Sequence, residues 1–174
     1  MTSHPDIDAA RSESQMPEAL AMLRSPARSA LRDAAAALDV AERYQQPLEM
    51  ALALAQMARC YRALQALGPA ATYLERALAW ARTLGAADQS VEILCLLAET
   101  SCSLAELHAN DDSRHSHAAL ERTRDRAFEA TGMAVHVTDL LRISDVLDRC
   151  GDHDDAVQLQ SRAMRLMYSA HVDG

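Results

Sequence analysis

The polar residues with the greatest capacity for chemistry cluster between two helical patterns. They mix imidazoles and carboxylates, at His108, Asn110, Asp111, Asp112, His115 and His117. A divalent metal could bind such side chains, but zinc sites usually consist of paired ligands with a second pair at a defined distance. His115 and His117 have no evident second pair, and the acids lack the glycine and terminal glutamate of a calcium loop. The sequence therefore favours a solvated insertion loop over a metal site.

A second cluster, Cys150 to Asp155, holds soft and hard potential ligands within six residues. A helix-to-helix turn explains it better. Gly151 supplies the backbone freedom of a turn, and the following acids favour the N-terminus of the next helix.

The four cysteines, Cys60, Cys95, Cys102 and Cys150, all fall inside helical patterns and form no CxxC pair. This spacing is typical of reduced thiols in a cytoplasmic protein. Cys95 and Cys102 share a helix face, but residues seven apart lie about 10 Å apart along a helix, too far for a disulfide.

Composition excludes several classes of function. The formal charge is −8 and the sequence contains no lysine, whereas a nucleic-acid-binding surface normally needs a basic patch. No stretch approaches eighteen uninterrupted apolar residues and Met1 to Asp8 does not resemble an export signal, so we expect a cytoplasmic protein without a membrane partner. The sequence holds no catalytic or cofactor motif that we recognise. We therefore expect that the protein is not an enzyme and that it binds no cofactor.

The elements that would position these residues are helices. Apolar residues recur at helical spacing, and proline, glycine and polar runs separate the segments. Residues 1–24 are expected to form a flexible arm with a short helix opened by Pro17. Residues 25–170 are expected to form one helical domain. Its segments are expected at about 26–43, 47–67 and 69–84, from beyond Gly85 to about 108, from beyond the polar run 110–113 to about 131, and at about 137–147 and 152–168. Gly68, Gly85 and Gly132 are interpreted as helix ends.

Two of these helix pairs repeat the same residue pattern. Leu54, Met57, Ala58, Tyr61, Ala70, Leu74, Ala77 and Leu78 match Leu140, Ile143, Ser144, Leu147, Ala156, Gln160, Ala163 and Met164 at identical offsets. The pattern resembles the tetratricopeptide repeat (TPR), in which small residues lock a second helix against the first. The resemblance implies an all-α fold, a right-handed α-α superhelix of antiparallel helix pairs.

The match covers roughly three and a half repeats from residue 26 to residue 168, with departures. The first stripe recurs after 40 and then 46 residues, at Leu94 and Leu140, which implies elongated helices and linkers. In the middle repeat, 19 residues separate Ser101 from Leu120 where the other repeats have 9, so about ten residues are inserted near 107–117.

In proteins of this family, the first helices of the pairs line a concave groove that binds peptides or partner helices. The equivalent positions here are Leu52, Ala55, Arg59, Arg62, Glu92, Cys95, Glu99, Cys102, Leu141, Arg142, Asp145 and Arg149. The alternative is that these are solvated charges opposite a core stripe. The family's well-known carboxylate clamp of Lys and Asn is not expected, since Asn110 is the one asparagine. A mixed Arg and acid groove suits a polar peptide or an amphipathic helix.

Three functions remain open. The first is an adaptor or scaffold that binds a protein partner in this groove, and the second is a regulator gated by a peptide or metabolite. The third is a metal-dependent enzyme using the His and Asp insertion. We also expect a homodimer, because the last helix carries Leu159, Ala163, Leu166, Met167 and Tyr168 over too wide an arc for one neighbour to cover.

Overall fold

The computed structural model describes residues 25–108 and 113–172, and for 113–116 and 170–172 it describes the helical backbone alone. Within these ranges the protein is all-α and has no strand. Its helices are α2 (Pro26–Arg43), α3 (Pro47–Ala63), α4 (Leu67–Thr83), α5 (Ala87–His108), α6 (Ser113–Met133), α7 (Val137–Arg149) and α8 (His153–Val172). The short helix expected from Pro17 lies outside the described residues.

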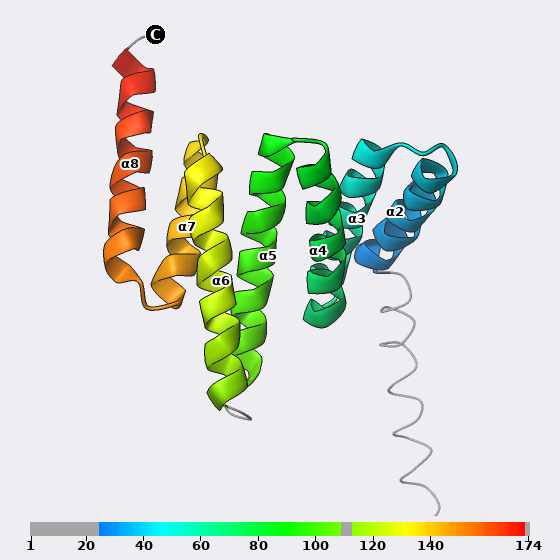
Figure 1. The fold of residues 1–174 in the computed structure, drawn as a ribbon, viewed down its shortest axis with the longest axis horizontal. Helices are drawn as coiled ribbons and strands as arrows, with labels where there is room; N and C mark the ends of the chain where they lie inside the picture. Colours follow the sequence, from blue (N-terminus) through cyan, green and yellow to red (C-terminus); the bar gives the residue numbers. More distant parts are fainter. Residues whose placement is uncertain (1–24, 109–112, 173–174) are drawn as a thin grey trace, which may run out of the picture.

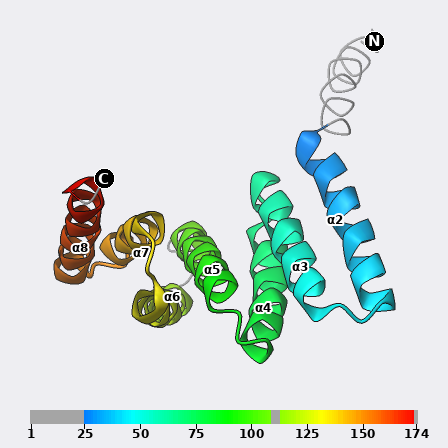
Figure 2. The ribbon, with the colours of Figure 1, turned by 90° about the horizontal axis from the view of Figure 1, so that it is seen from above.

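Consecutive helices run antiparallel and form a row from α2 to α8, so that α3, α5 and α7 point the same way (Figure 1). Each helix packs against its neighbours along the chain, and α5 also packs against α7. Seen from above, α4 and α6 lie toward one side of the row, while α3, α5 and α7 lie toward the other (Figure 2).

Small residues allow the helices of a pair to approach closely. Ala58, Ala70 and Ala77 are completely buried between α3 and α4, beside Leu54 and Leu74. Side chains of this size bring helix axes together, and the leucines fill the remaining space. The expected match between α3–α4 and α7–α8 holds for the helices themselves and for the buried small residues.

The two pairs differ on the outer side of the second helix. Leu78 on α4 is buried, whereas its equivalent on α8, Met164, is 48% exposed. The reason is that α4 packs between α3 and α5, while α8 packs against α7.

Four of the turns between helices share one backbone geometry. In each, one residue adopts a positive φ and the next N–H donates to a carbonyl five residues back, which closes the end of the helix. The positive-φ residues are Gln45, Gln65, Gly85 and Gly151. The hydrogen bonds run from Gln46 to Ala41, Ala66 to Tyr61, Ala86 to Ala81 and Asp152 to Leu147, at 2.9 to 3.0 Å.

Two glycines expected to end helices do not. Gly68 lies in the first turn of α4, since Gln65 makes the turn instead, and Gly132 lies within α6. At the start of α2, the backbone carbonyl of Ser25 accepts the N–H groups of Arg28 and Ser29, and the Ser25 side chain makes no capping hydrogen bond.

Part of the insertion near 107–117 is helical where the sequence suggested a loop. Helix α5 ends at His108, as expected, but α6 begins at Ser113, so His115 and His117 lie in a helix, while residues 109–112 lie outside the described residues. The long helix α5 occupies the middle of the row, and every residue from 93 to 98 is buried.

Candidate interaction face on helices α3, α5 and α7

Three acidic residues on α5 form the centre of the candidate site. Glu92, Glu99 and Glu106 are spaced by seven residues and therefore share one stripe of the helix. Because α3 and α7 present arginines toward this stripe, the three helices are joined by ion pairs. We call the seven residues Arg59, Arg62, Glu92, Glu99, Glu106, Arg142 and Arg149 the charge ladder.

Glu99 is the central member of the ladder. Arg62 Nη1 donates to its Oε2 at 2.8 Å, and Arg142 Nε donates to its Oε1 at 2.7 Å. The Glu99 side chain is 16% exposed, against 29% and 31% for the two arginines. One half-buried carboxylate thus connects α3 to α7 through α5.

The pKa of Glu99 reflects both its burial and its contacts with the two arginines. Burial acts to raise the pKa, but the hydrogen bonds and charges of Arg142 and Arg62 outweigh it, and the net pKa is lowered. The pKa of Arg142 is raised, because its bond to Glu99 outweighs its own burial. Both groups are therefore charged at neutral pH.

The outer glutamates of the ladder, Glu92 and Glu106, are more exposed than Glu99, at 51% and 52%. Arg59 pairs with Glu92, and both side chains are more than a third exposed. At the other end, Arg149 Nε and Nη2 bind the two oxygens of Glu106 at 2.9 Å each, and this pairing lowers the pKa of Glu106. Arg149 Nη2 also donates to Ser103 Oγ at 3.2 Å.

All twelve residues expected at the groove lie on these three helices, and nine of them, including Leu141 at 41%, are exposed or half-buried. Leu52 is 43% exposed and shares a face of α3 with Arg59. Asp145 lies 3.8 Å from Arg149. The sequence analysis missed Glu106, although its spacing from Glu92 and Glu99 was a usable signal.

Three further positions expected at the groove are core residues. Ala55, Cys95 and Cys102 are 4%, 1% and 0% exposed. On α5 the reason is that α4, α6 and α7 all pack against it. Burial raises the pKa of Cys95 to about 12, so this thiol is uncharged at neutral pH.

The other side of the row carries a separate set of contacts among α2, α4 and α6. Arg82 pairs with Glu129 and Arg126 with Glu75, while Arg76 lies 4.0 Å from Glu42. The described charges on both sides are thus largely paired within the chain, rather than simply solvated.

The potential metal ligands of the two clusters form no metal site within the part of the chain that the structure describes. Among the described residues, no group of three or more His, Cys, Asp or Glu side chains is arranged to hold a metal. Residues 110–112 lie outside the description, and His117 lies 3.5 Å from Glu121. Gly151 makes the turn before α8, as expected, and Asp154 and Asp155 lie in its first turn. None of the described helices combines the length and apolar content needed to cross a membrane.

Comparison with known proteins identifies a fold and no more. No family model and no curated protein matches the chain. Among solved structures, the chain is similar to BtubC (BKLC) from P. vanneervenii, with a TM-score of 0.50 and 16% identity over 83% of this chain. The match spans 58% of that protein, less than two thirds of its length.

Proposed function

We propose that the protein is an interaction module with TPR-like architecture, a right-handed α-α superhelix of helix pairs. The face of α3, α5 and α7 binds a peptide or an amphipathic helix of a partner protein. The supporting observation is the charge ladder, which holds three parallel helices side by side and leaves exposed leucines at its edge.

The ion pairs of the ladder differ in how easily a partner protein can replace them. Exposed ion pairs contribute little to stability, typically about 0 to 1 kcal/mol, so a partner can replace the Arg59–Glu92 contact at small cost. Glu99 and its two arginines are less exposed and would cost more to separate. We therefore assign partner contact to Leu52, Arg59, Glu92 and Asp145, and a positioning role to the centre.

This division fits a partner with both apolar and charged groups. Leu48 and Leu52 are one turn apart on α3 and 41% and 43% exposed, which suits the apolar stripe of a docking helix. Charged residues flanking that stripe could pair with Arg59 and Glu92 in place of their present contact. The four arginines and three glutamates of the ladder leave a net charge of only +1, so a strongly charged tail of one sign would find little charge to match.

Affinity capture with matched variants tests the proposal. Leu52→Glu and Arg59→Glu alter the face, whereas Leu84→Glu and Arg82→Glu alter a leucine of similar exposure and another interhelix ion pair elsewhere. Proteins retained by the wild type and by both control variants, but lost with both face variants, would be partners of the face. Equal capture by all four variants would refute it.

A second candidate, regulation by a small ligand, is favoured by one cavity. It measures about 340 Å³ and is lined by Glu42, Gln45, Pro47, Met50 and Trp80, where α4 approaches the turn between α2 and α3. Sites for small molecules usually have this size or larger. A metabolite that raises the melting temperature of the wild type but not of Trp80→Ala would support this function, because only binding to the folded state stabilises it. A metabolite library without any such compound would count against it.

A further inference from the structure

Two thiols from distant parts of the chain meet beside the charge ladder. Cys102 on α5 and Cys150 at the end of α7 lie close enough for each thiol to shift the pKa of the other. Contacts of the residues around them hold this part of α5 against the end of α7. Arg149, next to Cys150, binds Ser103 and Glu106, and Cys102 Sγ lies 3.6 Å from Glu106 Oε1.

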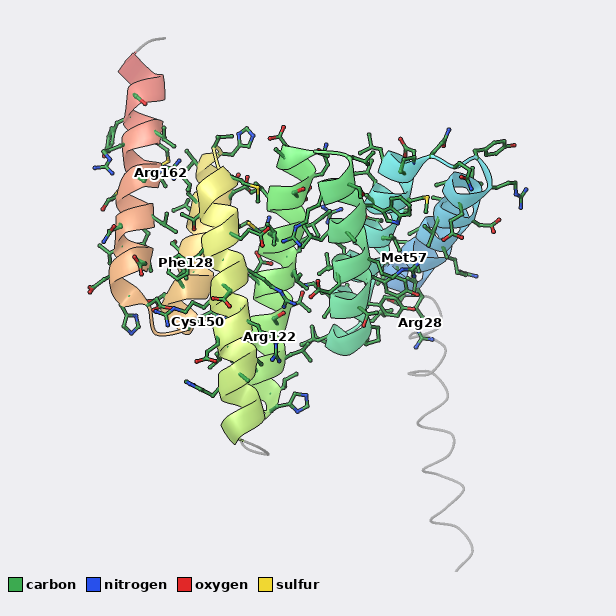
Figure 3. The ribbon with its side chains drawn as sticks, in the orientation of Figure 1. Arg28, Met57, Arg122, Phe128, Cys150 and Arg162 are labelled. Atoms are coloured by element: carbon green, nitrogen blue, oxygen red, sulfur yellow. The ribbon has the colours of Figure 1, made fainter. Side chains whose placement is uncertain are left out.

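The two thiols differ in their access to solvent. Cys102 is 0% exposed, whereas Cys150 is half-buried at the corner between α7 and α8 (Figure 3). A dissolved reagent therefore reaches Cys150 first. Cys102 is completely buried and therefore shielded from competing reactions.

The charges around the two cysteines also indicate that Cys150 reacts before Cys102. The hydrogen bond with Cys102 lowers the pKa of Cys150 more than burial raises it, and Arg149 and Arg124 lower it further. The pKa of Cys102 is raised by the same hydrogen bond and by burial. Because the thiolate is the nucleophilic form, Cys150 is the more reactive thiol.

We propose that Cys102 and Cys150 are a modification site at which a hydroperoxide forms a reversible disulfide within the chain. The thiolate of Cys150 attacks one peroxide oxygen, the O–O bond breaks, and a sulfenic acid and hydroxide form. Cys102 sulfur then attacks the sulfenic sulfur and the S–O bond breaks. With the Cys102 proton, the leaving hydroxyl becomes water. Overall, two thiols and one molecule of hydrogen peroxide give one disulfide and two molecules of water.

Cys60 and Cys95 are not placed to form this disulfide. Cys95 lies seven residues before Cys102 on α5, and this separation of about 10 Å along one helix prevents a bond between them. Cys60 belongs to α3 and is buried there. A link from Cys102 to Cys150 would fix α5 to the end of α7, at the level of the Arg149–Glu106 contact.

Peroxide treatment of the full chain tests the proposal. We would use Cys60→Ala/Cys95→Ala, which retains only Cys102 and Cys150, and the same protein with Cys150→Ser added. Hydrogen peroxide should remove both free thiols of the first protein, lower its mass by two hydrogen atoms and yield a linked peptide pair containing residues 102 and 150. Dithiothreitol should reverse all three changes. The Cys150→Ser protein should retain its thiol and remain unlinked within the chain.

Circular dichroism of each variant, and the same peptide map on the wild type, guard against effects of misfolding. Peroxide that adds oxygen to Cys150 without forming the link, or that links separate chains instead, would overturn the proposal. A wild-type map that joins other cysteines would overturn it as well.

Discussion

Replacing Glu99 by glutamine removes the central charge of the ladder while keeping the size of the side chain. Glu99 accepts hydrogen bonds from Arg62 and Arg142 at 2.8 and 2.7 Å. Hydrogen bonds to charged groups contribute about 1.5 to 3 kcal/mol each. The arginines are about a third exposed and can partly rehydrate, and one amide oxygen can still accept a bond. We therefore expect Glu99→Gln to lower the free energy of unfolding by about 2 kcal/mol.

Urea unfolding followed by circular dichroism would measure this loss, with Glu92→Gln as the matched control. Glu92 also bridges α5 to an arginine of α3, but its side chain is 51% exposed. Exposed ion pairs contribute about 0 to 1 kcal/mol, so the control should lose less than about 0.5 kcal/mol. Equal losses in the two variants would refute the reasoning that burial makes Glu99 central.

The same pair of proteins gives a pH test. The pKa of Glu99 is lowered in the folded state, so its charge contributes stability that is fully present above the pKa of the unfolded chain, about 4.3. This contribution is lost as the pH falls through the folded pKa. The stability difference between wild type and Glu99→Gln should therefore be constant near neutral pH and shrink below about pH 4. A difference that grows on acidification would contradict the assigned direction.

Three other changes test the packing, the turns and the outer helix. Ala77 is completely buried, so Ala77→Leu should lower the free energy of unfolding by about 1 to 3 kcal/mol through overpacking, and an unchanged urea midpoint would contradict the packing of α3 on α4. Gly151→Ala should cost about 1 kcal/mol or more, because alanine is strained at φ +90°. Gly132→Ala, in open space within α6, should instead gain up to about 1 kcal/mol, and equal thermal shifts would contradict this contrast. We also propose a homodimer through the exposed apolar residues of α8, so light scattering should give twice the chain mass for the wild type. It should give the single mass for Met167→Glu/Tyr168→Glu, and a wild type that stays monomeric at tens of micromolar would reject the dimer. The residues concerned are Met164, Leu166, Met167 and Tyr168.

Two helix starts were predictable from proline, whereas the helix expected to begin at Pro69 begins at Leu67. Pro26 and Pro47 open α2 and α3 at the expected residues, because proline fits the first turn of a helix without losing a hydrogen bond. The turn before α4 was not predictable in the same way. Gln65 adopts the left-handed conformation there, and glutamine carries no local signal for it. Its spacing of 20 residues from both Gln45 and Gly85 shows the regularity only after the structure is known.

The sequence predicted which residues lie on the candidate face better than it predicted which of them contact one another. The resemblance to the repeat family, together with helical spacing, placed Arg59, Glu99 and Arg142 on exposed sides of their helices. Which arginine meets which glutamate depends on how far each helix slides along its neighbour, and spacing within one helix does not contain that information. The placement of Cys95 and Cys102 in the groove was wrong for a related reason, because the pattern assumed one packed side for a helix that packs against three neighbours.

The central place of α5 also bears on how the chain opens and closes. Most packing in the row joins helices that are adjacent in sequence, a topology that favours rapid folding because few long loops must close. A helix at either end of the row can separate while giving up contacts on one side, whereas α5 cannot leave without parting α4, α6 and α7 together. Backbone amides in α2 and α8 should therefore exchange with solvent deuterium through local fraying. Those of α5 should exchange through opening of the whole row.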